Sequence, residues 1–187
     1  MERQQQPERR RQILEQLIAD SRTGLYDSRH LDFWLDAEIA RSRRYGYGFS
    51  LVLLDLDHFK TINDAHGHRV GYTVLADVGG IPRANCRVID MAFRYGGDEF
   101  VILLPQTSKN GGCRAALNSN RLTRNYQCKA LDGVALRITA SVGCAAYPND
   151  SLDGEELLDL ADKAMHHVKH TKRDGAAAAN RGILPLP

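Results

Sequence analysis

The chain has 187 residues, of which 43% are hydrophobic and 26% are charged. A chain of this length can bury roughly 70% of its unfolded surface, so it can form one core without a metal or a disulfide to hold it. Lys and Arg number 25 against 23 Asp and Glu, which gives a net charge of +2. The composition therefore excludes a disordered or disulfide-dense protein, and the near-balance of charge argues against nucleic acid as a partner.

The sequence shows no sign of a membrane span or a signal peptide. The longest apolar run, residues 49–54, is far shorter than the roughly 20 residues that cross a bilayer, and residues 1–12 are charged. The four cysteines are dispersed and form no Cys-x-x-Cys pair, so we expect reduced thiols and no zinc site. These features predict a cytoplasmic protein.

Apolar spacing predicts helices and strands in alternation. The expected helices cover residues 8–20, 29–45, 72–78 and 108–124, with two more starting near residues 58 and 153. The expected strands cover residues 49–55, 91–95, 99–104 and 134–145. This order predicts a central sheet that contains antiparallel pairs and carries packed helices. We divide the chain into an N-terminal helix or stalk (1–19), one domain (20–175) and a mobile C-terminal tail (176–187).

Local signals predict where several elements begin and end. Asp57 is placed to cap the helix that starts at His58. Gly79, Gly80 and Pro82 should stop or kink the helix before them. The pair Gly96-Gly97 lies between two strands and predicts a two-residue hairpin turn, in which glycine accepts the positive φ.

Carboxylates follow two of the predicted strands. Asp55 ends one strand, and Asp98 with Glu99 follows the Gly-Gly turn. If these strands are neighbours, Asp55 and Asp98 converge at one edge of the sheet, where they repel each other unless a cation such as Mg²⁺ lies between them. Basic residues that could neutralise bound phosphates are Lys60, Lys169 and Arg173, the last two spaced to share one helix face. The pattern predicts metal-assisted phosphoryl or nucleotidyl transfer, with ordinary solvated loop ends as the alternative.

An ordered series of motifs resembles the GGDEF family of diguanylate cyclases. The most specific motif is Arg-Tyr-Gly-Gly-Asp-Glu-Phe at residues 94–100. The other matching segments are residues 23–25, 54–60, 62–64, 67–68, 103–105, 141–143 and 161–162. The resemblance extends over residues 20–175.

The resemblance implies both a fold and a reaction. The fold is α/β (α+β), with a central five-stranded mixed sheet that includes the Gly-Gly hairpin and is flanked by helices, as in nucleotide cyclases and the polymerase palm. The reaction condenses two GTP molecules into cyclic di-GMP and releases pyrophosphate, with each 3′-hydroxyl attacking the α-phosphate of the other nucleotide. Because each domain of this family holds one GTP, the resemblance also implies a homodimer that brings the two reactants together.

Carried over by position, the resemblance implies roles for individual residues. Asp55, Asp98 and the Leu56 carbonyl would coordinate Mg²⁺ or Mn²⁺, and Asp98 would also be the base for the 3′-hydroxyl. Glu99 is a further candidate for either role. The remaining expected contacts with substrate are Lys60, Lys169 and Arg173 at the phosphates, Gly96 and Gly97 beside the nucleotide, and Asn63 and His68 at the guanine.

Arg87 and Asp90 resemble the RxxD site at which the product inhibits members of this family. Arginine suits the Hoogsteen edge of guanine and phosphates, and a carboxylate can accept from the N1 and N2 donors of guanine. An ordinary surface ion pair is the alternative. A second arginine from the next helix normally completes the site, for which Arg121 and Arg124 are the candidates.

The sequence departs from the family pattern at the guanine pocket. The family has an acid where this chain has Tyr72, and a carboxylate can accept from both N1–H and N2–H₂ of guanine, whereas a phenol offers one acceptor. Tyr72 leaves open a slower guanine enzyme, a purine-relaxed cyclic dinucleotide synthase, or an inactive domain that binds nucleotide or cyclic di-GMP. Smaller departures are Arg22 in place of a leucine and Lys172 in place of a glycine.

Overall fold

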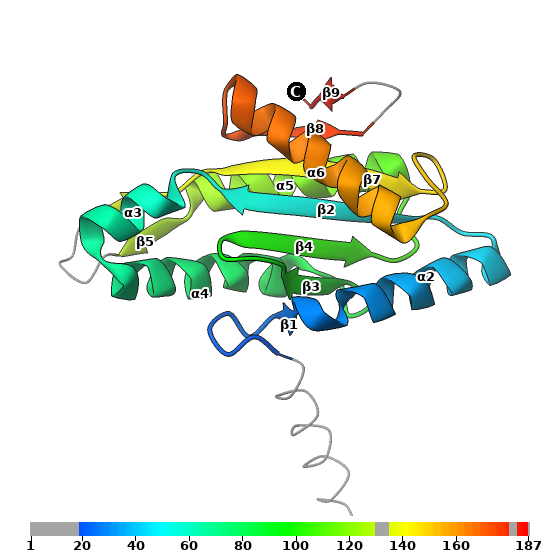
Figure 1. Cartoon of the computed structure of the whole chain (residues 1–187), viewed down its shortest axis with the longest axis horizontal. Coiled ribbons are helices and arrows are strands. Elements are labelled where there is room, and N and C mark those ends of the chain that lie inside the picture. Colours follow the sequence, from blue (N-terminus) through cyan, green and yellow to red (C-terminus); the bar gives the residue numbers. More distant parts are fainter. Residues whose placement is uncertain (1–18, 130–134, 180–182, 187) are drawn as a thin grey trace, which may run out of the picture.

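A seven-stranded mixed sheet organises the protein. The computed structural model describes residues 19–129, 135–179 and 183–186, so nearly all of the helix expected over residues 8–20 lies outside the described residues. The strands of the sheet are β1 (Tyr26–Asp27), β2 (Phe49–Leu56), β3 (Met91–Arg94), β4 (Glu99–Leu104), β7 (Ala140–Tyr147), β8 (Gly175–Ala178) and β9 (Leu184–Pro185). They lie in the order β1-β3-β4-β2-β7-β8-β9, with β2 at the centre (Figure 1). The β1–β3 and β7–β8 pairs are parallel and the others antiparallel.

Helices cover both faces of this sheet. They are α2 (Leu31–Tyr45), which follows the short 3₁₀ helix η1 (Ser28–His30), then α3 (Phe59–His66), α4 (His68–Asn85), α5 (Lys109–Asn125) and α6 (Gly154–Thr171). Helices α4 and α5 pack on one face, and α2 and α6 pack on the other (Figure 1). The sheet is therefore the middle layer of three.

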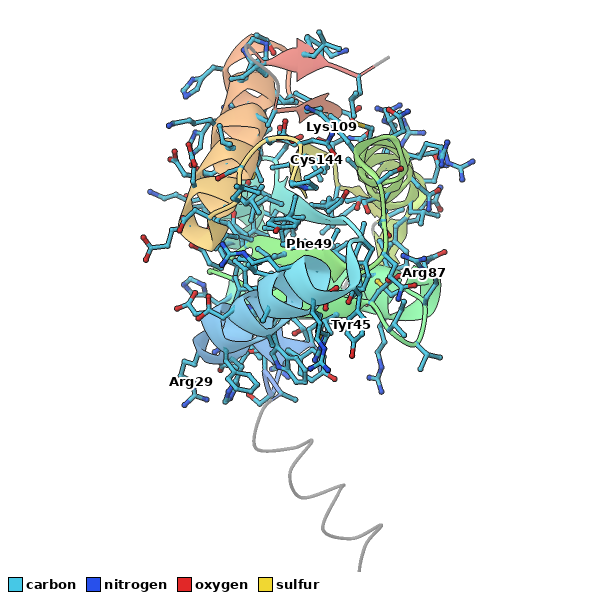
Figure 2. All side chains as sticks on the ribbon, turned by 90° about the vertical axis from the view of Figure 1, so that its right-hand side faces the viewer. Arg29, Tyr45, Phe49, Arg87, Lys109 and Cys144 are labelled. Carbon is cyan, nitrogen blue, oxygen red and sulfur yellow. The ribbon has the colours of Figure 1, made fainter. Side chains whose placement is uncertain are left out.

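The central strand β2 shows why its apolar residues run together without alternation. All eight of its residues are buried, as the sequence predicted. Val52 and Leu54 join the core beneath α4 and α5, whereas Leu51 and Leu53 join the core beneath α2 and α6. A strand that is buried on both faces needs apolar side chains on both sides. Viewed from the side, Phe49 lies inside the molecule while Arg87 extends from its surface (Figure 2).

The number of strands differs from the expected five. The five interior strands β3, β4, β2, β7 and β8 are joined at the two edges by β1 and β9, which are two residues long each. The strand expected over residues 134–145 is also divided. Its first part belongs to β6 (Ala135–Arg137), which pairs with β5 (Gln127–Lys129) in a separate ladder, and β7 follows in the main sheet.

The C-terminal segment is not wholly the mobile tail that we expected over residues 176–187. Residues 175–178 form β8, a buried strand that pairs with β7. Its sequence, Gly-Ala-Ala-Ala, contains no alternation of apolar and polar residues from which a strand could be predicted. Small side chains suit this place because α5 and α6 both contact the strand.

Helix α4 is continuous where the sequence predicted an interruption. It runs from His68 to Asn85 with Pro82 inside it. Gly79 allows close packing, since a Cβ there would lie 2.8 Å from the Cβ of Thr23. The burial of apolar residues such as Val74 and Val78 against the sheet outweighs the weak helix propensity of this segment.

Among the described residues, no helix combines the length and the apolar character that crossing a bilayer requires.

Candidate active site

Three acidic residues meet at the edge of the sheet where β2 ends and β4 begins. Asp55, the next-to-last residue of β2, is the register partner of Glu99, the first residue of β4. The Leu56 N–H donates to the Asp98 carbonyl oxygen at 3.2 Å. Antiparallel pairing thus brings together residues that are more than 40 positions apart in the chain, as the strand pattern predicted.

The Asp55 carboxylate is buried among other negative charges. Its side chain is 5% exposed, and Lys169 Nζ lies 2.5 Å from its Oδ2 atom. Burial raises the pKa of Asp55 to about 6; the hydrogen bond from Lys169 opposes this shift, and the charges of Asp98 and Glu99 add to it. This edge therefore favours a bound cation, and the ammonium of Lys169 supplies the nearest positive charge.

These donors fit a hard divalent cation that keeps part of its shell open. Within the residues that the structure describes, no three His, Cys, Asp or Glu side chains are arranged so that they could hold a metal ion by themselves. The expected set uses Asp55, Asp98 and the Leu56 carbonyl, with Glu99 beside them. Mg²⁺ is commonly held by one or two carboxylates, with water and substrate phosphates completing its shell. The donor set matches that mode of binding.

The β3–β4 connection is a hairpin, but its glycines do not have the geometry that we predicted. The turn spans four residues, Tyr95 to Asp98, and neither Gly96 nor Gly97 has a positive φ. The N–H groups of Tyr95 and Gly96 both donate to the Glu99 carbonyl oxygen, at 2.8 and 3.2 Å. A Cβ at Gly96 would lie 2.4 Å from Glu99 Oε2, whereas Gly97 faces open space. Gly96 thus provides room for a carboxylate.

Asp57 does not cap α3, which corrects the sequence prediction. The N-cap position is His58, and no side chain caps that helix. The buried Asp57 carboxylate instead accepts from Thr139 Oγ1 at 2.7 Å, Ser141 Oγ at 2.8 Å and the Asp174 N–H at 3.0 Å. It ties the end of β2 to the start of β7 and to the turn between α6 and β8.

The turn that Asp57 holds also carries Arg173. Helix α6 ends at Thr171, and both Arg173 and Asp174 have positive φ, at 53° and 45°. Arg124 on α5 pairs with Asp174 at 2.8 Å. Arg173 is therefore an exposed turn residue and not the helical neighbour of Lys169 that the four-residue spacing predicted. Lys60 is exposed on α3.

The residues expected at the guanine lie around the α3–α4 junction. A Cβ at Gly71 would fall 1.9 Å from Asn63 Oδ1, so the glycine lets the Asn63 amide lie directly against α4. His68 and Tyr72 are one turn apart on α4, with ring centroids 6.5 Å from each other. The guanidinium carbon of Arg22 lies 3.8 Å from the centroid of the Tyr72 ring. In the sequence, Arg22 and Tyr72 are two separate departures from the family pattern, and in the structure they are in contact.

Comparison with known proteins agrees with the motifs and the fold. The family model described as "Diguanylate cyclase, GGDEF domain" matches residues 17–175. The chain belongs to the GGDEF family.

Similar proteins include enzymes of cyclic di-GMP turnover. The chain is 36% identical over 165 residues to the bifunctional diguanylate cyclase/cyclic di-GMP phosphodiesterase MucR of Pseudomonas aeruginosa, covering 88% of this chain and 24% of MucR. It is also 36% identical over 155 residues to the diguanylate cyclase DosC of Escherichia coli K12, covering 83% of this chain and 34% of DosC. The chain thus spans about a quarter to a third of the length of these relatives.

Solved structures of GGDEF domains have the same fold. The GGDEF domain of DgcB from Caulobacter crescentus, in complex with c-di-GMP, has a TM-score of 0.82 and 28% identity, over 88% of this chain and 94% of that one. The diguanylate cyclase SiaD of Pseudomonas aeruginosa, in complex with its activator SiaC, has a TM-score of 0.84 and 32% identity, over 95% and 68%.

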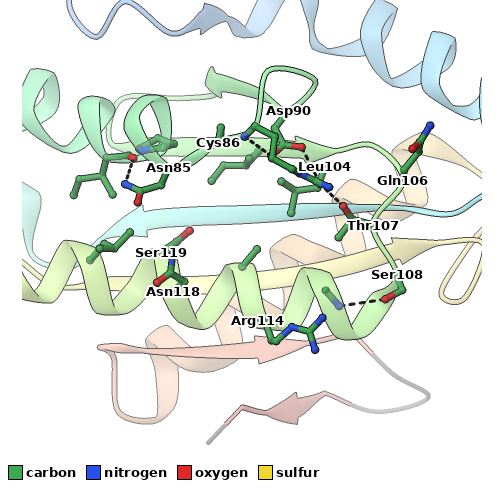
Figure 3. Close-up of a pocket in the computed structure, with 17 residues that line it drawn as sticks. Asn85, Cys86, Asp90, Leu104, Gln106, Thr107, Ser108, Arg114, Asn118 and Ser119 are labelled. Atoms are coloured by element: carbon green, nitrogen blue, oxygen red, sulfur yellow. Dashed lines mark hydrogen bonds and ion pairs between the residues drawn. The ribbon is translucent and has the colours of Figure 1, made fainter.

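This GGDEF domain has a second candidate site, a hollow of about 480 Å³ between α4, β4 and α5 (Figure 3). Arg87 and Asp90 line it, and Arg87 Nη2 lies 3.0 Å from Asp90 Oδ1 and 2.6 Å from Thr107 Oγ1. The structure therefore brings together the two residues of the RxxD motif, while their role in binding stays a prediction.

The arginine that lines this hollow from α5 is Arg114, a residue that the sequence analysis missed (Figure 3). The two arginines that we expected are engaged elsewhere. Arg121 donates to Asn118 Oδ1 at 2.8 Å, and Arg124 pairs with Asp174. No sequence signal separated these arginines, because the choice depends on which face of α5 is turned toward β4.

Proposed function

We propose that this chain is a diguanylate cyclase that acts as a homodimer and requires Mg²⁺ or Mn²⁺. It condenses two molecules of GTP into cyclic di-GMP and releases pyrophosphate. The observation that carries the proposal is the convergence of Asp55, Asp98 and Glu99 with Lys169 at one sheet edge of a GGDEF domain. A nucleotide substrate also fits the cytoplasmic location that the sequence predicts.

The acidic edge would hold the metal ion and start the reaction. Asp55, Asp98 and the Leu56 carbonyl would bind the ion, with Glu99 next to them. The bound cation would offset the charge of the triphosphate. Asp98 would accept the proton of the attacking 3′-hydroxyl, and Glu99 is the second candidate because it lies at the same edge.

The basic residues around this edge would bind the phosphates. Lys169 already lies beside the acidic edge, where it offsets the charge of Asp55. Arg173 extends from the turn that Asp57 holds, and Lys60 is exposed at the start of α3. Three positive groups on separate elements suit a triphosphate that must be held while its α-phosphate is attacked.

Two subunits are a requirement of this chemistry. One domain offers one acidic edge, so a single copy would hold one GTP, while the product needs two. The attack becomes efficient only when a second domain presents its own nucleotide at close range. The product would then inhibit by binding in the hollow lined by Arg87, Asp90 and Arg114.

A nucleotide-binding module without cyclase activity is the second candidate. The observation that favours it is Tyr72, which stands where the family pattern has an acid and is covered by Arg22. A relaxed purine selection is a third outcome of the same substitution. The complete Gly-Gly-Asp-Glu-Phe segment favours the enzyme.

One assay separates these outcomes. The protein is incubated with Mg²⁺ and GTP, ATP or both, and the cyclic dinucleotides are identified by mass. Cyclic di-GMP formed from GTP supports the proposal, and chelation of the metal should abolish it. A mixed product would indicate relaxed selection. No product at any protein concentration, together with measurable nucleotide binding, would support the binding module.

A further inference from the structure

Beside the start of α4, Arg22 lies over Tyr72, the residue that stands where the family pattern has a carboxylate. The Arg22 guanidinium covers the Tyr72 ring at 3.8 Å, and His68 lies one helical turn before Tyr72 on the same face. Tyr72 remains 42% exposed, so this cluster faces solvent. Its charge is positive, and its hydrogen-bond donors outnumber its acceptors.

Arg22 is held in this place by the turn that contains it. Asp20 Oδ1 accepts from the backbone N–H groups of Arg22, at 3.2 Å, and of Thr23, at 2.9 Å. Asp20 also pairs with Arg94 at 3.1 Å, which fixes the turn to β3. Thr23 packs against Gly79, so the same turn lies directly on α4. The position of Arg22 over Tyr72 is therefore supported on both sides.

The stacked guanidinium keeps donors for a ligand. Stacking uses the flat face of the group and leaves the N–H bonds at its edge free. Within residues 19–129, 135–179 and 183–186, no carboxylate pairs with the Arg22 guanidinium, which stacks on the Tyr72 ring. The edge of the guanidinium can thus meet an acceptor pair on a nucleotide.

The chemistry of the bases decides which acceptor pair fits. Arginine has five donors and no acceptor, so it cannot replace a carboxylate at the N1–H and N2–H₂ donors of guanine. Guanine offers two neighbouring acceptors, O6 and N7, to which arginine donates in a bidentate manner. Adenine presents a donor at N6 beside its N7 acceptor and therefore opposes the second hydrogen bond.

Building on the proposed function, we propose that Arg22, supported by Tyr72, selects guanine through its Hoogsteen edge by donating to O6 and N7. The chain thereby keeps a preference for GTP over ATP without the acid. The N2 amino group of the base contributes little to this preference, whereas N7 contributes strongly.

Base analogues test the proposal directly on the full chain. Binding of GTP, ATP, inosine triphosphate and 7-deaza-GTP is measured by displacement of a fluorescent GTP analogue, with Ca²⁺ replacing Mg²⁺ to limit turnover. Inosine triphosphate, which lacks the N2 amino group, should bind within about twofold of GTP. ATP and 7-deaza-GTP, which lacks N7, should bind at least about tenfold more weakly. The opposite order, with 7-deaza-GTP equal to GTP and inosine triphosphate weakened, overturns the proposal.

Variants show whether Arg22 causes the pattern. Arg22→Leu should reduce the tenfold penalty for 7-deaza-GTP to about twofold or less. The double variant Arg22→Leu/Tyr72→Asp restores the family residues, so it should tolerate 7-deaza-GTP and discriminate against inosine triphosphate. Arg29→Leu removes an exposed arginine a few residues away, paired with Asp27, and should leave the ratios unchanged.

Melting temperatures establish that each variant is folded before the ratios are compared. A folded Arg22→Leu protein that keeps the full 7-deaza-GTP penalty overturns the proposal and leaves the proposed function intact. If no nucleotide binds to the parent protein with either metal, both the proposal and the proposed function fail.

Discussion

The phosphate side and the base side of the candidate active site differ in how far they follow the family pattern. On the proposed phosphate side, Asp55, Asp98 and Lys169 follow the family pattern by position and lie at one sheet edge. On the base side, Arg22 and Tyr72 both depart from it and contact each other. The phosphate side is built on β2, β4 and α6, whereas the base side is built on the 20–25 turn and α4. The groups proposed for transfer and those proposed to select the base can therefore vary independently.

The largest expected effect concerns the phosphate side. Asp98→Ala and Glu99→Ala should each lower product formation on the order of 10³-fold or more, because each removes charge from the acidic edge where metal and proton transfer are proposed. Both residues are only partly buried, so the fold should persist. Product is measured by mass with Mg²⁺ and GTP, and folding by circular dichroism. Turnover retained in both variants would show that this edge is not the site.

A substitution at Lys169 tests whether the acidic edge needs a neighbouring positive charge when no metal or nucleotide is bound. Lys169→Met should lower turnover about 10²-fold. It should also destabilise the metal-free protein, on the order of 2 kcal/mol, because buried Asp55 loses its partner. Mg²⁺ should then raise the melting temperature more in the variant than in the parent protein. Lys163→Met, at an exposed ion pair on the same helix, is the matched control and should change neither quantity. An equal response to Mg²⁺ in the parent and Lys169→Met proteins would contradict the prediction.

The hollow lined by Arg87, Asp90 and Arg114, the proposed product site, extends the comparison to regulation. Arg114→Ala should weaken cyclic di-GMP binding about tenfold, because Arg114 lines the hollow that contains Arg87 and Asp90. Arg121→Ala removes an arginine from the same helix and should leave the affinity unchanged. Calorimetry measures both affinities. A loss in Arg121→Ala with none in Arg114→Ala would favour Arg121, one of the two candidates expected from the sequence, over Arg114.

The smallest expected effect concerns the support of the base side. Burial tends to raise the pKa of Asp20, but hydrogen bonds from Thr23 and the nearby Arg94 charge outweigh it and hold the pKa below its usual 3.8. A carboxyl with a lowered folded-state pKa stabilises the protein above its unfolded pKa, and this contribution is lost as the pH falls through the folded value. Asp20→Asn should therefore cost about 1 kcal/mol at pH 6, and the difference from the parent protein should shrink below pH 3.8. Urea unfolding from pH 6 to below pH 3.8 measures the free energy of unfolding of both proteins. A difference that does not change with pH would contradict the stabilising role given to the Asp20 carboxylate.

The sequence predicted features that depend on short-range pattern or on the ordered motifs. Strand β2, its neighbour β4 and the start of α6 near residue 153 were found in this way, as was the proximity of Asp55 to Asp98. These features follow from apolar runs, capping residues and the family resemblance.

The features that could not be predicted depend on contacts between residues far apart in the chain, which local sequence patterns do not encode. Asp57 matches a helix cap by position, yet its partners lie 82 to 117 residues away. Gly96 is needed for the approach of Glu99 and not for a positive φ. Nothing in the spacing indicated that Arg22 would cover Tyr72, 50 residues later, because the contact depends on how the 20–25 turn lies on α4.

The unbroken course of α4 has a consequence for communication across the domain. Its 18 residues span about 26 Å. Tyr72 lies near one end, and Asn85, which lines the hollow that contains Arg87 and Asp90, lies at the other. Between these ends, Gly79 packs closely against Thr23. If a ligand at one end tilted this helix about that contact, the other end would move with it, and binding at the two ends would be reciprocally linked.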